Sequence, residues 1–338
     1  MAENIEKIVA MRKFMDEHLS AYTFDPKMEL EKNYKCVSYE QKSLAFINGD
    51  VFAISDSFIV YAITVLGCAE AGVIAEFLKI YKKNNPDFLI PEFDKDTIKT
   101  RLAALKKTGF LFNINYVDNT ECNKNPDYTS GSHHSLYTAG KDATTLMNSR
   151  LRRQVKPNTW IASKPMDELL GIAASAMVFT KLMASPWFVK LENAIFKGRN
   201  CGTVKLDNEF ISEMGKQKYY VGMMSVYLHM QPDFMSDENY TELINYKLNV
   251  INDYLLNRTK KGIAKMILVC ESNKDMVRMA QAIINSGAFT QEVLNNIHFT
   301  SAGLVDGYGK GPEDWFLNIV LDPTAKNGFT YDISKPFI

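Results

Sequence analysis

The sequence lacks the features that mark a zinc site, a disulfide framework or a membrane span. Its five cysteines are odd in number and far apart, and no C-x-x-C pair occurs among them. Neither a zinc ribbon nor a disulfide framework is therefore indicated. No apolar run reaches the ~18 residues that a membrane-spanning helix needs. The N-terminal stretch MAENIEKIVAMRKFM is too charged for a signal peptide. These absences predict a cytoplasmic, reduced protein with no membrane partner.

A net charge of either sign is also missing. The chain has 39 lysines and arginines against 39 aspartates and glutamates. No global positive field draws it to nucleic acid, so any DNA binding must come from a local cluster of cations. No P-loop, G-x-S-x-G or H-E-x-x-H motif occurs, and we predict no catalytic residue and no cofactor. His133 and His134 are adjacent in an expected strand, which places them on opposite faces, so we predict no metal site there.

What is present is an ordinary globular composition in a chain of two-domain length. The 338 residues are 46% hydrophobic and 23% charged. We predict an N-terminal helical segment at 1–51, a first domain at 52–157 and an α/β domain at 158–338. The boundary is placed at the basic run RLRRQVKPN, which ends at Pro157. The fold class expected is α/β, or α+β overall.

The pattern of residues 52–157 is typical of a winged helix-turn-helix domain, a fold that usually binds double-stranded DNA. Asp94 or Asp96 caps the third helix, and Gly109 ends it. The polar stretch between the two strands forms a long hairpin tip, the wing. The expected elements are helices at 55–67, 70–84 and 97–108, strands at 110–117 and 133–138, and a helix from Gly140 to about Gln154.

The helix at 97–108 is the candidate DNA-contacting element. Ile98, Leu102 and Leu105 form one stripe that packs inward. Threonine, alanine and lysine lie on the other side and offer hydroxyls, methyls and charge to bases and phosphates. The candidate contacts are Thr97, Lys99, Thr100, Arg101, Lys106 and Lys107 on the helix, Lys124 in the tip, and Arg150, Arg152 and Arg153 behind it. The alternatives are a solvated helix face, an exposed loop and a solvated linker.

Helices and strands alternate in the second half, which argues for an α/β domain with some parallel pairing. A buried helix opens it, and KYYVGMMSVYLHM is its most apolar strand. The segment GLVDGYGKGPEDW resembles a phosphate-binding loop but opens no clear helix, so a plain loop is favoured. The expected elements are helices at 166–184, 239–258 and within 271–287, strands at 203–206, 219–230, 265–271 and 297–300, and one further strand in DWFLNIVLD. An amphipathic helix with Ile5, Ile8, Val9, Met15 and Leu19 on one stripe is expected at 3–20.

The order of parts resembles the replication-relaxation family of plasmids and conjugative elements. TRLAALKKTGFL and SLYTAGKDA match in the first domain. MDELLGIAASAMVFTKL, KYYVGMMSVYLHM, TELINYKLNVINDYLLN and KMILVCES match in the second. The resemblance spans about residues 52 to 300. It implies a winged helix joined to a restriction-endonuclease-like domain, in a DNA-binding accessory factor of mobile-element replication or transfer. Family members often carry a glutamate in the strand that matches KYYVGMMSVYLHM, and this chain has none.

We therefore predict a DNA-binding protein whose second domain is a non-catalytic scaffold for self-association as a homodimer or for a protein partner. One alternative is a nuclease that recruits a metal through Asp207, Glu209 and Glu271. Another is a protein-interaction module whose winged helix does not touch DNA. Metal-dependent nicking would distinguish the first alternative, and the absence of duplex binding the second.

Overall fold

The computed structural model shows a chain that divides into two compact units, both of mixed α/β structure. It describes residues 2–18, 22, 31–33, 50–87, 90, 92–108, 110–118, 132–140, 143, 161, 163–192, 194–228 and 236–333. One unit, here the middle unit, is Phe24–Met183. The other, here the C-terminal unit, combines Met1–Thr23 with Ala184–Ile338. The middle unit is therefore inserted, in sequence, into the C-terminal unit.

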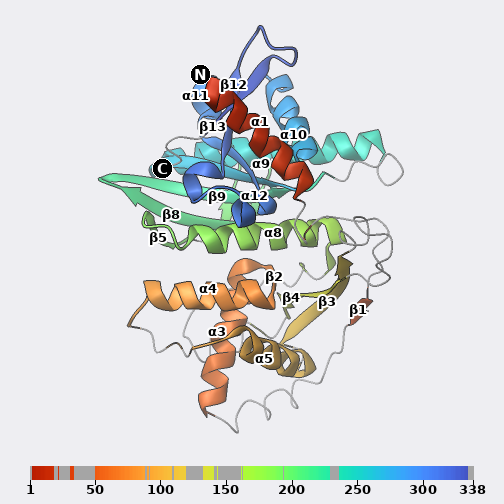
Figure 1. Ribbon diagram of the computed structural model, residues 1–338, viewed down its shortest axis with the longest axis vertical. Helices are drawn as coiled ribbons and strands as arrows, with labels where there is room; N and C mark the ends of the chain where they lie inside the picture. Colours follow the sequence, from red (N-terminus) through yellow and green to blue (C-terminus); the bar gives the residue numbers. More distant parts are fainter. Residues whose placement is uncertain are drawn as a thin grey trace. The chain divides into compact units, whose positions relative to one another are not determined.

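The middle unit combines helices with a four-stranded antiparallel sheet of order β1-β3-β4-β2. The return strand β4 pairs on one side with β3 and on the other with the short β2. Strand β2 lies between the first two helices and was not predicted. The elements are β1 (Glu31–Asn33), α3 (Asp50–Leu66), β2 (Cys68–Glu70), α4 (Ala71–Asn84), α5 (Lys95–Thr108), β3 (Leu111–Asp118), β4 (Ser132–Ala139) and α8 (Met166–Leu182) (Figure 1).

Helix α4 forms where the apolar pattern predicts it, whereas α3 starts five residues earlier than predicted, at Asp50. Helix α4 buries its predicted stripe, including Phe77 and Tyr81, and ends at Asn84, two residues before Pro86. Helix α3 ends at Leu66, where Gly67 adopts a φ of 80°. That left-handed conformation suits glycine and turns the chain directly into β2.

Helix α8 belongs to the middle unit, although its sequence was predicted within the α/β domain. The side-chain amide of Asn84 donates to the carbonyl of Met183 at 3.1 Å, just past the end of α8. Lys181 lies 3.4 Å from Glu76 of α4. The predicted boundary at Pro157 falls outside the described residues, and the compact units divide after Met183. Nearly all of α8 is buried, as its small and apolar residues predict.

The C-terminal unit is built on a seven-stranded sheet of order β13-β12-β11-β10-β9-β8-β5. Strands β9, β10 and β11 run parallel and are connected through α9 and α10, as the predicted alternation requires. The other neighbours are antiparallel. The strands are β5 (Phe188–Leu191), β8 (Asn208–Met214), β9 (Gln217–Val226), β10 (Ile263–Cys270), β11 (Ile297–Ser301), β12 (Leu317–Leu321) and β13 (Phe329–Ile333); the helices are α9 (Asp237–Thr259) and α10 (Asn273–Asn285).

Smaller elements complete this unit. Strands β6 (Ile195–Lys197) and β7 (Thr203–Lys205) form a separate hairpin, and α11 (Gln291–Leu294) precedes β11. The segment GLVDGYGKGPEDW was predicted as a plain loop. The structure instead places α12 (Ala302–Gly307) at its start and the 3-10 helix η2 (Pro312–Asp314) near its end. The side-chain oxygen of Ser301 accepts a hydrogen bond from the backbone N–H of Leu304 at 3.1 Å. Ser301 is therefore the N-cap of α12.

The first helix, α1 (Ala2–Glu17), packs on the C-terminal unit beside α10, α12 and β13 (Figure 1). Arg12 Nε donates to Asn273 Oδ1 at 2.8 Å, and Lys7 forms an ion pair with Asp314. The helix was predicted, and two residues of its predicted stripe, Ile8 and Met15, are buried. Ile5 and Val9 are each 57% exposed, because the buried stripe is Ile8, Met11 and Met15.

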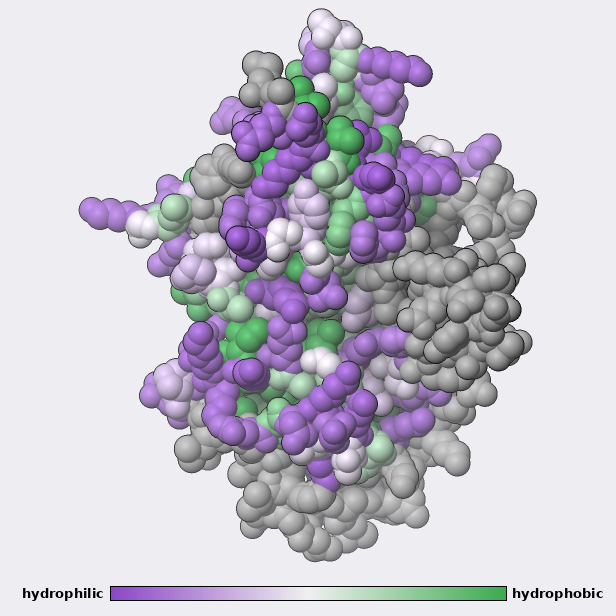
Figure 2. Space-filling view, viewed as in Figure 1, coloured by the Kyte–Doolittle hydropathy of each residue, from purple (hydrophilic) through white to green (hydrophobic). Residues whose placement is uncertain are grey.

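The core of the C-terminal unit lies between one face of its sheet and helices α1, α9 and α10. Met276, Met279 and Ile283 of α10 are all fully buried, as their spacing predicts. Hydrophilic side chains make up most of the described surface seen in Figure 2, with apolar ones scattered between them. Within the described part of the chain, no helix has both the length and the apolar character to cross a bilayer.

Candidate nucleic-acid interface

Helix α5 is fixed in place by its first turn and by its apolar stripe. The carboxylate of Asp94 accepts a hydrogen bond from the backbone N–H of Thr97 at 2.6 Å, so Asp94 caps the helix. This hydrogen bond also lowers the pKa of Asp94. Ile98, Leu102 and Leu105 are all 0% exposed, as predicted. The opposite face of the helix therefore points away from the core of the middle unit.

The outward face of α5 carries small and polar side chains. Thr97, Lys99, Thr100 and Ala103 are exposed, whereas Ala104 and Lys106 are half-buried. The hydroxyl of Thr100 donates to the carbonyl of Asp96 at 3.0 Å. A hydroxyl whose proton is donated within its own helix still has lone pairs that can accept a hydrogen bond from an amino group of a base. The side chain of Lys107 lies outside the described residues.

Arg101 was predicted to contact DNA, but in the structure its side chain forms an ion pair inside the middle unit. Its Nε and Nη2 atoms donate to the two carboxylate oxygens of Asp56 in α3, at 2.8 and 2.5 Å. The side chains of Asp56 and Arg101 are only 1% and 13% exposed. Burial raises the pKa of Asp56, against the opposing effect of Arg101. Arg101 therefore fastens α5 to α3, and its guanidinium faces inward rather than toward a phosphate.

The other candidates lie in parts of the chain outside the described residues. These are Lys124 in the hairpin tip, Arg150, Arg152 and Arg153 behind it, and Gly109 as the end of the third helix. His134 is described, and its Nδ1 lies 2.9 Å from a carboxylate oxygen of Glu70. That contact joins β4 to β2, the strand that sequence patterns missed.

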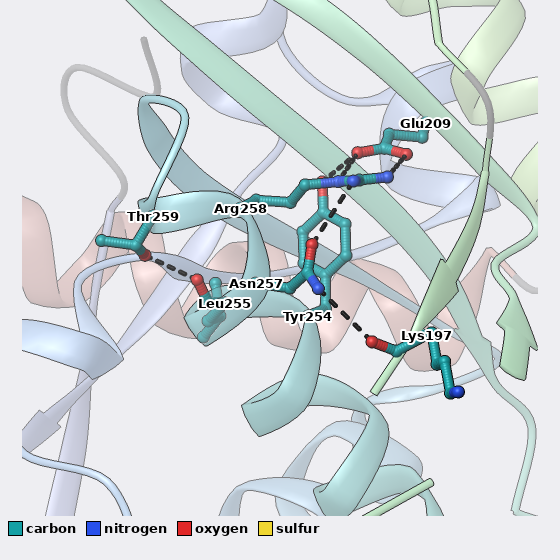
Figure 3. A network of polar contacts seen from close by, with 7 residues as sticks. All are labelled: Lys197, Glu209, Tyr254, Leu255, Asn257, Arg258 and Thr259. Carbon is teal, nitrogen blue, oxygen red and sulfur yellow. Dashed lines mark hydrogen bonds and ion pairs between the residues drawn. The ribbon is translucent and has the colours of Figure 1, made fainter. Parts of the chain in front are cut away.

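Glu209, one of the three acids of the nuclease alternative, forms a buried ion pair with Arg258 (Figure 3). Its two oxygens accept from Arg258 Nε at 2.6 Å and Nη2 at 2.7 Å, and the hydroxyl of Tyr254 donates at 3.1 Å. Glu209 and Arg258 are 2% and 7% exposed. Burial raises the pKa of Glu209, while the hydrogen bonds from Arg258 lower it. Those same hydrogen bonds raise the pKa of Arg258.

The other two acids of that alternative do not complete a metal site with Glu209. Asp207 accepts a hydrogen bond from the backbone N–H of Ser225 at 2.6 Å, and Lys247 donates to the carbonyl of Ser225 at 2.9 Å. Glu271 follows the end of β10. Among the described residues, no group of three histidine, cysteine, aspartate or glutamate side chains could hold a metal ion. The three acids are therefore not brought together as a cation-binding cluster.

The sequence held a signal for the buried ion pair of the middle unit. Asp56 is an acid within the otherwise apolar helix DVFAISDSFIVYAITVL, and a buried carboxylate requires a partner. The partner, Arg101, was instead assigned to DNA because it lies beside exposed lysines.

Comparisons with protein-family models, with curated proteins and with solved structures found no match for this chain.

Proposed function

We propose that the middle unit is a winged-helix domain that binds double-stranded DNA. The observation that carries the proposal is the order of its elements together with their pairing. Helix α3 leads to β2, helices α4 and α5 follow, and β3 and β4 form the hairpin. The short β2 pairs with the return strand β4. A helix, a strand, two helices and a hairpin, with the first strand paired to the last, is the arrangement of a winged-helix domain.

The surface of α5 supports DNA as the partner. The second of the two consecutive helices is the element that enters the major groove in helix-turn-helix proteins. In this chain that helix is α5, and its exposed residues are short polar side chains, one alanine and two lysines. Such a surface is thin enough to approach base edges closely. Because Arg101 is committed to Asp56, we assign the phosphate contacts of this helix to Lys99, Lys106 and Lys107.

The C-terminal unit acts as a scaffold in this proposal. The antiparallel strands β5, β8 and β9, followed by α9 and the parallel strand β10, support the resemblance to restriction-endonuclease-like domains. The occupied Glu209 and the absence of an acid from β9 favour a non-catalytic role. From the resemblance to the replication-relaxation family, we infer that the protein assists replication or transfer of a mobile element.

The proposal is tested by fluorescence anisotropy with labelled duplexes across a salt series. Replacing Lys99 and Lys106 with glutamine should flatten the slope of log Kd against log salt by about 2, from about 0.9 for each lost phosphate contact. Replacing Thr100 with alanine should change the preference between sequences and leave the slope unchanged. The matched control replaces Lys79 and Lys83 on α4 with glutamine and should bind like the wild-type protein.

Two results would contradict this function. If the wild-type protein binds no duplex at low salt, the domain is a protein-interaction module. If the Lys99 and Lys106 variant binds with the same slope as the control variant, α5 does not contact the phosphate backbone.

A further inference from the structure

The hairpin of β6 and β7 presents two cations on a loop that the structure holds firmly. Lys197 and Arg199 at its tip are exposed. The carboxylate of Asp253 in α9 accepts from the backbone N–H groups of Asn200 and Cys201, at 2.6 and 3.0 Å. A Cβ atom at Gly198 would clash with that carboxylate, so the loop is packed directly against α9. The two cations are therefore carried by an ordered turn.

The last turns of α9 bring further cations next to this hairpin. The side-chain amide of Asn257 donates to the carbonyl of Lys197 at 3.3 Å, which joins the helix to the hairpin. In Figure 3 the side chain of Lys197 extends away from the buried pair of Glu209 and Arg258. Lys260 and Lys261 follow the end of the helix and are exposed.

The strands joined by the turn between β8 and β9 also come close to the helix end. A Cβ atom at Gly262 would lie 2.8 Å from the carbonyl oxygen of Lys218, so the backbones are in close contact there. Lys216 is exposed in the turn, and Lys218 extends over the ring of Tyr220 at 5.3 Å. We call the surface formed by these three segments the α9 basic end. It consists of Lys197, Arg199, Lys216, Lys218, Lys260 and Lys261.

The α9 basic end has an excess of positive charge in a chain whose formal net charge is zero. No ion pair joins any of its six cations to another residue in the described part of the chain. Two nearby carboxylates have partners within the unit. Glu209 forms an ion pair with Arg258, and Asp253 accepts hydrogen bonds from the backbone of the hairpin. Glu213, opposite Lys218, is an exposed acid at this end. The helix dipole favours cations at Lys260 and Lys261, but it does not explain those on the hairpin and the turn.

We infer that the α9 basic end is a second contact surface for the phosphate backbone of duplex DNA. Cations spread over three segments suit a repeating row of phosphates, which gives affinity without sequence preference. The inference rests on the proposed DNA partner but is independent of α5. Leu256 and Met214 are 60% and 56% exposed beside the surface. Their exposure makes an anionic membrane the competing occupant, which the test below distinguishes.

The test uses the full chain and a labelled duplex of mixed sequence in an anisotropy salt series. The patch variant replaces Lys197, Lys260 and Lys261 with glutamine. The expected result is a slope of log Kd against log salt that is flatter by about 2 to 3, again at about 0.9 for each contact. The matched control removes the same charge from Lys274, Lys310 and Lys326 of the same unit and should keep the wild-type slope. Circular dichroism of each variant confirms that it is folded.

The outcomes separate this inference from the proposed function. If the patch variant keeps the slope of its control while the Lys99 and Lys106 variant loses affinity, the inference fails and the winged-helix function stands. If only the patch variant loses affinity, the inference stands and the assignment of DNA contact to α5 fails. A wild-type protein that binds no duplex overturns both. Binding to vesicles of phosphatidylcholine and phosphatidylserine that is lost in the patch variant, without an effect on DNA, would identify a membrane as the occupant and overturn the inference.

Discussion

Replacing Arg258 with methionine removes the charge that compensates the buried carboxylate of Glu209, while keeping an unbranched side chain in its place. The Glu209 side chain is 0% exposed and that of Arg258 is 8% exposed, so water cannot take over the lost contacts. An exposed ion pair contributes only about 0–1 kcal/mol. Removing one partner of a buried pair costs about 3–5 kcal/mol, because the other charge is left without compensation. We expect a loss of that size in the free energy of unfolding of the C-terminal unit.

The same reasoning predicts a rescue and a pH dependence. Replacing Glu209 with glutamine in the Arg258→Met background removes the stranded charge and should restore most of the lost stability. Burial already raises the pKa of Glu209, and losing Arg258 should raise it further. A carboxyl with a raised pKa in the folded state loses stability as pH rises above its unfolded pKa of about 4.3. The Arg258→Met variant should therefore be closer to the wild-type stability at acidic pH than at alkaline pH.

Urea unfolding followed by tryptophan fluorescence measures these differences, because two of the three tryptophans, Trp187 and Trp315, belong to the C-terminal unit. The matched control is Lys260→Met, which removes an exposed charge two residues further on and should change stability by less than about 0.5 kcal/mol. If Arg258→Met costs no more than this control, or if Glu209→Gln fails to restore stability, the pair does not hold the unit together as argued.

Two further predictions follow from other buried charges. Asp275 in the first turn of α10 is 4% exposed, and burial raises its pKa from the ordinary 3.8 to about 7, against the effect of Arg278. Between pH 3.8 and about 7, the folded state therefore holds a proton that the unfolded state releases. The free energy of unfolding should fall by about 1.4 kcal/mol per pH unit within this range. Urea titrations across this range should show the slope in wild type and its loss in Asp275→Asn. For the pair in the middle unit, Arg101→Gln should cost about 3–5 kcal/mol in the unfolding of α5, measured by amide hydrogen exchange. An unchanged exchange rate would return Arg101 to the candidate DNA contacts.

Elements with a strong local pattern could be predicted from the sequence. Helix α4 ends where Asn84 and Asn85 precede Pro86, and α5 starts at the cap Asp94. Strands β9 and β10 are long apolar runs separated by one long helix, which made their existence predictable; only some parallel pairing in this domain was predicted, and the structure places it between these strands and β11. In each case the signal lies within about one element of the chain, so no knowledge of distant contacts was required.

The parts that were missed depend on residues far apart in the sequence. Strand β2 has three residues and exists because Cys68–Glu70 pairs with β4, where Cys68 lies opposite Thr138, 70 positions later. The partners in the two buried ion pairs are 45 and 49 positions apart. Helix α1 has apolar residues on more than one side, and the side that is buried is decided by elements that follow much later. Spacing within a helix cannot reveal such partners.

The position of α1 has a consequence for the order in which the two units fold during translation. Lys7 and its ion-pair partner Asp314 are separated by 307 positions. At about 5–20 residues per second, a ribosome takes roughly 15–60 s to deliver the second partner after the first. During that interval the whole of the middle unit leaves the ribosome, while Met11 and Met15 have not yet met the surface that buries them. The inserted unit can therefore fold during translation, whereas the unit that surrounds it must wait for its last strands.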